Sequence, residues 1–192
     1  ALHREGFEVY ALDFPAHGEA KGVQLPWIDA VNVLHHTLNE LGPFHAVIGH
    51  SYGGSMLLNT LNLAHQYPQW KIKNEPESVI LLASPTRMHT PVIRLARQFH
   101  LTAKGYMLLR QVFRKKAVID LKKLDFRYYI PHANIPFLCI HGQDDEVIKP
   151  SESIVFCDQY KNASLSLLSN LDHIGILLDK RVENLVCNFL LR

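Results

Sequence analysis

The sequence has few of the features that mark membrane, secreted or metal-binding proteins. No apolar run approaches the ~20 residues that a helix needs to cross a bilayer, and no signal-peptide pattern opens the chain. Only three cysteines are present, without C-x-x-C spacing, which argues against a disulfide framework or a zinc site. We interpret Cys139, Cys157 and Cys187 as buried thiols in a reducing compartment and therefore expect a cytoplasmic protein.

The sequence does not indicate metal ligation or nucleic-acid binding. Twelve histidines occur, but they show neither H-E-x-x-H nor a comparable ligand spacing, so we expect no metal and no other cofactor. No basic and aromatic platform accompanies the charge, which argues against a nucleic-acid partner. With 47% apolar and 20% charged residues and no internal repeats, the chain is predicted to form one globular domain spanning residues 1–192.

Half of the basic residues lie in one segment. Of the 20 lysines and arginines, ten fall between Arg87 and Lys123, where Asp120 is the only acid. Such a segment can attract anionic substrates or make peripheral contact with a membrane surface. It can also be a solvated helical face balanced by acids elsewhere, and this is the more common situation.

Strand-like and helix-like segments alternate along the chain, a pattern typical of a mostly parallel sheet covered by helices. The sequence therefore predicts an α/β fold. Strands are expected at residues 7–12, 44–48, 78–83, 135–140 and 163–168. Helices are expected at 27–41, from 55 onward, and at 91–100, 106–116 and 180–191. The connection 86–132 contains two of these helices and is predicted to be a helical lid over a site, or else additional helical packing.

The most informative motif is Gly49-His50-Ser51-Tyr52-Gly53-Gly54, which matches G-x-S-x-G. It lies between an expected strand and an expected helix. A sharp turn there would hold Ser51 in a strained conformation, with its hydroxyl exposed at the sheet edge. Glycines suit such a turn, because a side chain would push the helix away from the strand. Ser51 is therefore a candidate nucleophile.

A serine nucleophile needs a base and an acid that orients the base. Asp144 and Asp145 follow the strand expected at 135–140, so one of them is well placed as the acid. His173 lies in the loop after the last expected strand and is the candidate base. The order serine, aspartate, histidine is that of α/β-hydrolases. If a histidine is the base, activity should fall below about pH 6.5, where histidine becomes protonated.

From residue 7 to the final helix, the chain resembles bacterial serine hydrolases, esterase-like enzymes of the α/β-hydrolase fold. The resemblance rests on Asp13-Phe14-Pro15-Ala16-His17-Gly18, the G-x-S-x-G motif, His141-Gly142-Gln143-Asp144-Asp145 and Leu171-Asp172-His173. In that family the last residue of His-Gly-x-x-Asp is commonly the triad acid, which implies Asp145 rather than Asp144. His17 and His50 belong to these motifs and are expected to shape the site. Glycine usually precedes the family histidine, whereas Asp172 stands there in this chain.

The sequence identifies only part of the site that would stabilise the reaction oxyanion. The backbone N–H of Tyr52, after the nucleophile, is one expected donor. In the family the second comes from a loop after an earlier strand, and no such loop precedes Ala1. We therefore expect the N-terminal strands to be absent from this chain. The segments 7–12 and 44–48 would then pair directly, leave a gap, or borrow a strand from another chain.

The leading hypothesis is a serine hydrolase that cleaves a small-molecule carboxylic ester or related acyl substrate through an acyl-enzyme at Ser51, with His173 and Asp145. The main alternative is an inactive hydrolase-fold binding protein with an incomplete oxyanion hole. A third hypothesis is an enzyme of the same fold that performs lyase or acyltransferase chemistry. The identity of the substrate and the oligomeric state are not predicted by the sequence.

Overall fold

Four short apolar segments form a single parallel sheet in the computed structural model, which describes residues 2–87, 96–117, 125–126 and 134–192. The strands lie side by side in chain order: β1 (Val47–His50), β2 (Val79–Leu82), β3 (Phe137–Gly142) and β4 (Ala163–Leu168). All three pairings are parallel. Every residue of β2 and β3 is buried, as expected for apolar strands with helices on both faces. The expected α/β class is confirmed.

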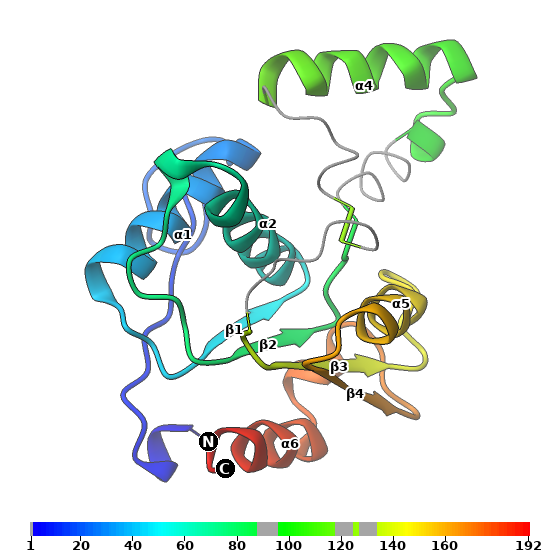
Figure 1. Cartoon of the computed structure of the whole chain (residues 1–192). Helices are drawn as coiled ribbons and strands as arrows, with labels where there is room; N and C mark the ends of the chain where they lie inside the picture. Colours follow the sequence, from blue (N-terminus) through cyan, green and yellow to red (C-terminus); the bar gives the residue numbers. More distant parts are fainter. Residues whose placement is uncertain (1, 88–95, 118–124, 127–133) are drawn as a thin grey trace.

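Helices cover both faces of this sheet (Figure 1). Apolar side chains of α1 (Trp27–Leu41), α2 (Tyr52–Gln66) and α5 (Ser151–Gln159) pack on one face, against residues such as Leu81 and Phe137. On the other face, α6 (Lys180–Leu190) packs against alternate strand residues such as Ile80 and Leu138. This alternation follows from the two-residue period of a strand. Short 3-10 turns lie at η1 (Leu2–Glu5), η2 (Pro68–Trp70) and η4 (Gly175–Leu177).

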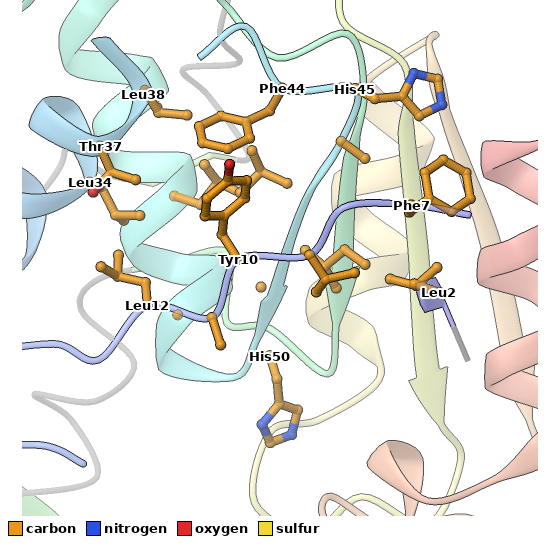
Figure 2. A pocket seen from close by; sticks show the side chains of 18 of the residues that line it. Leu2, Phe7, Tyr10, Leu12, Leu34, Thr37, Leu38, Phe44, His45 and His50 are labelled. Atoms are coloured by element: carbon orange, nitrogen blue, oxygen red, sulfur yellow. The ribbon is translucent and has the colours of Figure 1, made fainter. Parts of the chain in front are cut away.

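The prediction of a strand at residues 7–12 is wrong. The segment has no regular secondary structure and makes no ladder with β1, and Val9 and Tyr10 are 52% and 58% exposed. It is held by ring contacts instead, with Phe7 stacked on His45 and Tyr10 edge-on to Phe44. A largely apolar cavity of about 390 Å³ separates it from β1 (Figure 2). Of the two arrangements expected within one chain, direct pairing and a gap, the gap is observed.

The predicted lid falls largely outside the described residues. Positions 91–95 of the helix expected at 91–100 are among those not described, and residues 96–98 are helical. The next helix is present as α4 (Ala103–Ala117), set apart from the sheet in Figure 1. It exposes Met107, Leu108 and Val112 and contains no acidic residue. The lid at 86–132 and its contact with a membrane surface therefore stay predictions.

The described start of this connection is anchored to the body of the molecule. Thr86 donates its backbone N–H to the buried carboxylate of Glu152 on α5 at 3.1 Å, and the guanidinium of Arg87 pairs with the same carboxylate. Arg87 also forms an isolated antiparallel bridge with Asp125. Among the helices that the structure describes, none is long and apolar enough to span a bilayer.

Candidate active site

Ser51 occupies the sharp turn between β1 and α2. Its φ of 50° and ψ of −118° lie outside the regions that L-residues ordinarily adopt, as expected for a nucleophile on a strained turn. Gly49 and Gly54 make the turn possible, because a Cβ on Gly49 would collide with the Gly54 backbone and one on Gly54 with Ser84. Gly53 differs from its neighbours, since a Cβ there would meet nothing within 4 Å. Steric crowding therefore accounts for two of the three glycines.

His173 lies between Ser51 and Asp145. Its Nε2 is 2.9 Å from Ser51 Oγ, and its Nδ1 is 2.7 Å from Asp145 Oδ2. Because the carboxylate can only accept, Nδ1 carries the proton and Nε2 is free to accept the hydroxyl proton of Ser51. The three residues come from the ends of β1, β3 and β4, which share one edge of the parallel sheet. The structure thus joins the three side chains that the sequence had singled out.

Asp145 is buried and fully engaged. It is 1% exposed, and its Oδ1 accepts the backbone N–H groups of Val147 and Ile148, each at 2.8 Å. Burial alone would raise the pKa of this carboxyl. The hydrogen bonds from His173, Ile148 and Val147 and the attraction of the His173 charge together lower the pKa below its usual value. Asp145 is therefore held as the carboxylate that an orienting acid must be.

Asp144 has a different environment from its neighbour. Its side chain is exposed, while its backbone N–H bonds to Leu171 O at 3.1 Å. Gly142 permits this close approach of the two loops, because a Cβ there would collide with the Leu171 carbonyl. The loop after β3 is thereby fastened to the loop that carries His173. Of the two aspartates, only Asp145 contacts the histidine among the described interactions.

Residues 14–174 match the serine hydrolase (FSH1) family. The chain belongs to that family. A search of curated protein sequences finds no significant match. The expected membership of a serine hydrolase family is confirmed, and with it the general activity of a serine hydrolase.

Solved structures similar to this FSH1-family chain are α/β-hydrolases. A monoacylglycerol lipase from Paleococcus ferrophilus superposes with a TM-score of 0.64 at 18% identity, over 98% of this chain and 84% of that one. The α/β-hydrolase domain-containing protein 10 from mouse superposes with a TM-score of 0.63 at 16% identity, over 92% of this chain and 74% of that one. The esterase EaEST from Exiguobacterium antarcticum superposes with a TM-score of 0.62 at 15% identity, over 94% of this chain and 80% of that one. These likenesses show the shared fold.

Two further histidines surround the site of this hydrolase-family chain. Nε2 of the half-buried His50 is 3.0 Å from the carbonyl oxygen of His173, and the centroids of the two rings are 4.9 Å apart. Burial lowers the pKa of His50, so near neutral pH it is an uncharged donor that holds the His173 loop. His141 is wholly buried behind Asp145. Its place in the His-Gly-x-x-Asp motif was visible in the sequence, but its contacts were not.

Asp172 shapes the loop instead of contacting the imidazole. The side chain is exposed, and its Oδ1 accepts the N–H groups of Ile174 at 3.1 Å and Gly175 at 2.6 Å. The His17 side chain makes a local contact, between Nδ1 and Pro15 O at 3.1 Å. The residue that replaces the family glycine thus forms a turn immediately after His173. Of the two motif histidines expected to shape the site, His50 contacts the loop that carries His173.

Other site expectations have mixed outcomes. Tyr52 is the first residue of α2, so its N–H has no partner within the helix and remains a candidate oxyanion donor.

Of the three cysteines expected to be buried, Cys139 is buried, whereas Cys157 and Cys187 are partly exposed. All three are free thiols. Within the described part of the chain, no group of three or more His, Cys, Asp or Glu side chains is arranged to hold a metal.

Proposed function

We propose that this chain hydrolyses carboxylic esters or related acyl compounds by nucleophilic catalysis at Ser51. The observation that carries the proposal is the unbroken hydrogen-bonded series from Ser51 Oγ through the His173 ring to Asp145. A serine hydroxyl is a weak nucleophile unless a base removes its proton as it attacks. His173 Nε2 is within hydrogen-bond distance of that proton, and its other ring nitrogen is already fixed by a carboxylate.

The reaction proceeds in two halves. Ser51 Oγ attacks the acyl carbon while His173 Nε2 takes the hydroxyl proton, and the negative charge on Asp145 stabilises the imidazolium that forms. The imidazolium then gives the proton to the leaving alcohol, which departs and leaves an acyl-serine. In the second half, His173 takes a proton from water, the hydroxide oxygen attacks the acyl carbon, and the returned proton releases Ser51 with the carboxylic acid.

The developing oxyanion needs N–H donors aimed at it. Tyr52 N–H, at the positive end of the α2 macrodipole, supplies one. Loss of a single such donor costs about 10²–10³ in rate in other serine enzymes. The rate of ester hydrolysis by this chain therefore depends strongly on the second donor. The alternative of an inactive binding protein corresponds to a site in which no second donor is provided.

Turnover of short-chain p-nitrophenyl esters tests the proposal. We expect hydrolysis by the wild type and a fall of about 10³-fold or more in Ser51→Ala, because the covalent intermediate can no longer form. Ser151→Ala, which changes an exposed serine at the start of α5, is the matched control and should keep wild-type turnover. Equal turnover in Ser51→Ala and the wild type would contradict the proposal. Analysis of the products separates hydrolysis from transfer of the acyl group to another acceptor.

A further inference from the structure

Behind Asp145 lies a buried polar cluster that the catalytic steps do not use. It consists of His141 at the end of β3 and Ser153 on α5, which are 0% and 2% exposed. His141 Nδ1 is 2.7 Å from Ser153 Oγ, and its Nε2 is 2.9 Å from the carbonyl oxygen of Ile148. The same Nε2 is 3.3 Å from Asp145 Oδ2. Both ring nitrogens therefore have partners inside the protein.

These partners select one form of the imidazole. The Ile148 carbonyl can only accept, so Nε2 of His141 carries a proton. Ser153 can donate its hydroxyl hydrogen to Nδ1, which is then the acceptor, and the ring is neutral. Burial, the largest influence, lowers the pKa of His141 despite the nearby Asp145 carboxylate, and the charge of His173 acts in the same direction. A neutral ring is thus consistent with both the hydrogen bonds and the surroundings.

The neutral ring also fixes the loop that carries the triad acid. Ile148 is held at two points, since its N–H donates to Asp145 Oδ1 and its carbonyl accepts from His141. Asp145 Oδ1 is thereby occupied by backbone donors, and Oδ2 is left facing both His173 and the N–H of His141. A rotated carboxylate would lose contacts on both oxygens. The arrangement leaves one orientation of Asp145 in which all partners are satisfied.

We propose that His141, held in its Nε2–H form by the Ile148 carbonyl with Ser153 as the partner of Nδ1, is a positioning residue that fixes the Asp145 carboxylate and through it the orientation of His173. The proposal rests on the proposed function, in which Asp145 orients the base. It extends the series of polar contacts by two residues, to His141 on β3 and Ser153 on α5. The competing interpretation is a core histidine that satisfies its own ring nitrogens and contributes only to stability.

Two substitutions of His141 distinguish these roles. His141→Leu removes the contacts of both ring nitrogens, and we expect kcat to fall by about 10- to 100-fold with little change in KM, the size of effect known for residues that orient metal ligands. His141→Gln can place an amide N–H where Nε2–H lies, so it should recover most of that loss. Ser153→Ala removes only the partner of Nδ1 and should give a smaller fall in the same direction.

The pH profile separates positioning from stability. A misplaced Asp145 stabilises protonated His173 less well, so the acid limb of kcat should move to lower pH in His141→Leu and return in His141→Gln. Val186→Ala, a buried substitution on α6, is the control for destabilisation alone. It should lower the melting temperature without moving the acid limb. An acid limb and kcat that stay at wild-type values in folded His141→Leu would overturn the proposal.

A measurement that does not depend on turnover keeps this proposal separate from the proposed function. In ¹⁵N NMR spectra of the full chain, we expect His141 to show protonated Nε2 and unprotonated Nδ1. The titration midpoint of His173 should move to lower pH in Ser153→Ala and further in His141→Leu. A protonated Nδ1 on His141, or a His173 titration unchanged in both variants, would refute the positioning role even if ester turnover failed. If His141→Leu does not fold, Ser153→Ala and His141→Gln still decide the question.

Discussion

Asp145 illustrates what single residues contribute to this site. The sequence placed two adjacent aspartates after β3, and only the family resemblance favoured the second. In the structure Asp145 is buried against His173, whereas Asp144 is exposed. Two residues one position apart therefore have different environments, because the turn after Gly142 directs one side chain inward. A pattern of residue types does not specify such a direction.

Asp145→Asn tests the orienting role. An asparagine amide donates where the carboxylate accepts, so it favours the His173 form with unprotonated Nδ1 and a protonated Nε2 that cannot take the Ser51 proton. We expect kcat for ester hydrolysis to fall by about 10³- to 10⁴-fold. Asp144→Asn, with the same chemical change one residue away, should retain wild-type kcat. Similar losses in both variants would argue against a specific role for Asp145.

Among the helices and strands, a sequence-based prediction succeeded where a neighbouring element covers the apolar side of the segment. The residues 163–168 form a strand as expected, and 27–41 form α1, because each has an apolar pattern that a neighbouring element covers. The segment 7–12 has the composition of a strand but pairs with no neighbouring strand. The helix α5 was not expected, since its apolar periodicity over Ser151–Gln159 is weak. Strand composition alone thus does not predict pairing.

The turn that joins β1 to α2 is the element on which Ser51 depends. An added methyl group on Gly54 would collide with Ser84 and approach the carbonyl oxygen of Gly49. We expect Gly54→Ala to lower the free energy of unfolding by about 1–3 kcal/mol, the usual cost of overpacking, and to reduce ester turnover as Ser51 is displaced. Chemical denaturation and kinetics on the same preparation would measure both.

Gly53→Ala is the matched control for that substitution. A Cβ at Gly53 enters open space, and alanine favours a helix over glycine by up to about 1 kcal/mol. Its stability should therefore equal or exceed that of the wild type. The added double variant Gly54→Ala/Ser84→Gly should recover part of the lost stability, because it removes the side chain with which the methyl group collides. If Gly53→Ala and Gly54→Ala were equally destabilising, crowding at Gly54 would not explain its presence.

For the whole molecule, the parallel order of the strands made the site foreseeable from the sequence. The carboxyl ends of parallel strands share one edge, so loops after β1, β3 and β4 had to meet there. Their chain order indicated Ser51, His173 and one of the two aspartates after β3, and the family resemblance favoured Asp145. His141 was missed as a positioning residue because its partners, Ser153 and Ile148, are recognised only when α5 and the loop before it are placed. Spacing along the chain carries no information on such contacts.

The buried histidines of the site link the stability of the whole molecule to pH. Burial lowers the pKa of His50 and His141 in the folded protein, so below about pH 6.5 the unfolded chain takes up protons that the folded chain does not. Stability contributed by these residues is therefore present above that pH and is lost as the pH falls. Asp145, whose pKa is also lowered, adds a further loss below about pH 4.

Urea unfolding between pH 8 and pH 4 measures this dependence. We expect the free energy of unfolding to decrease from about pH 6.5 downward, and His50→Gln to make the decrease shallower. His45 acts in the opposite sense, since its bond to the Leu190 carbonyl and its contact with Glu77 raise its pKa and stabilise the fold at low pH. His45 is largely exposed, so its effect should be the smaller one. A stability that rises steadily from pH 6.5 to pH 5 would contradict this balance.

Covalent labelling by a fluorophosphonate probe tests the central claim most directly, because the probe reacts only with a serine whose hydroxyl is activated. Peptide mapping by mass spectrometry should locate the adduct on Ser51 in the wild type. The labelling rate should fall by at least about 10³-fold in His173→Gln, which removes the base, and should be unchanged in Ser151→Ala. No adduct on Ser51 in the folded wild-type protein, or equal labelling rates with and without His173, would contradict the account of Ser51 as a nucleophile activated by His173 and Asp145.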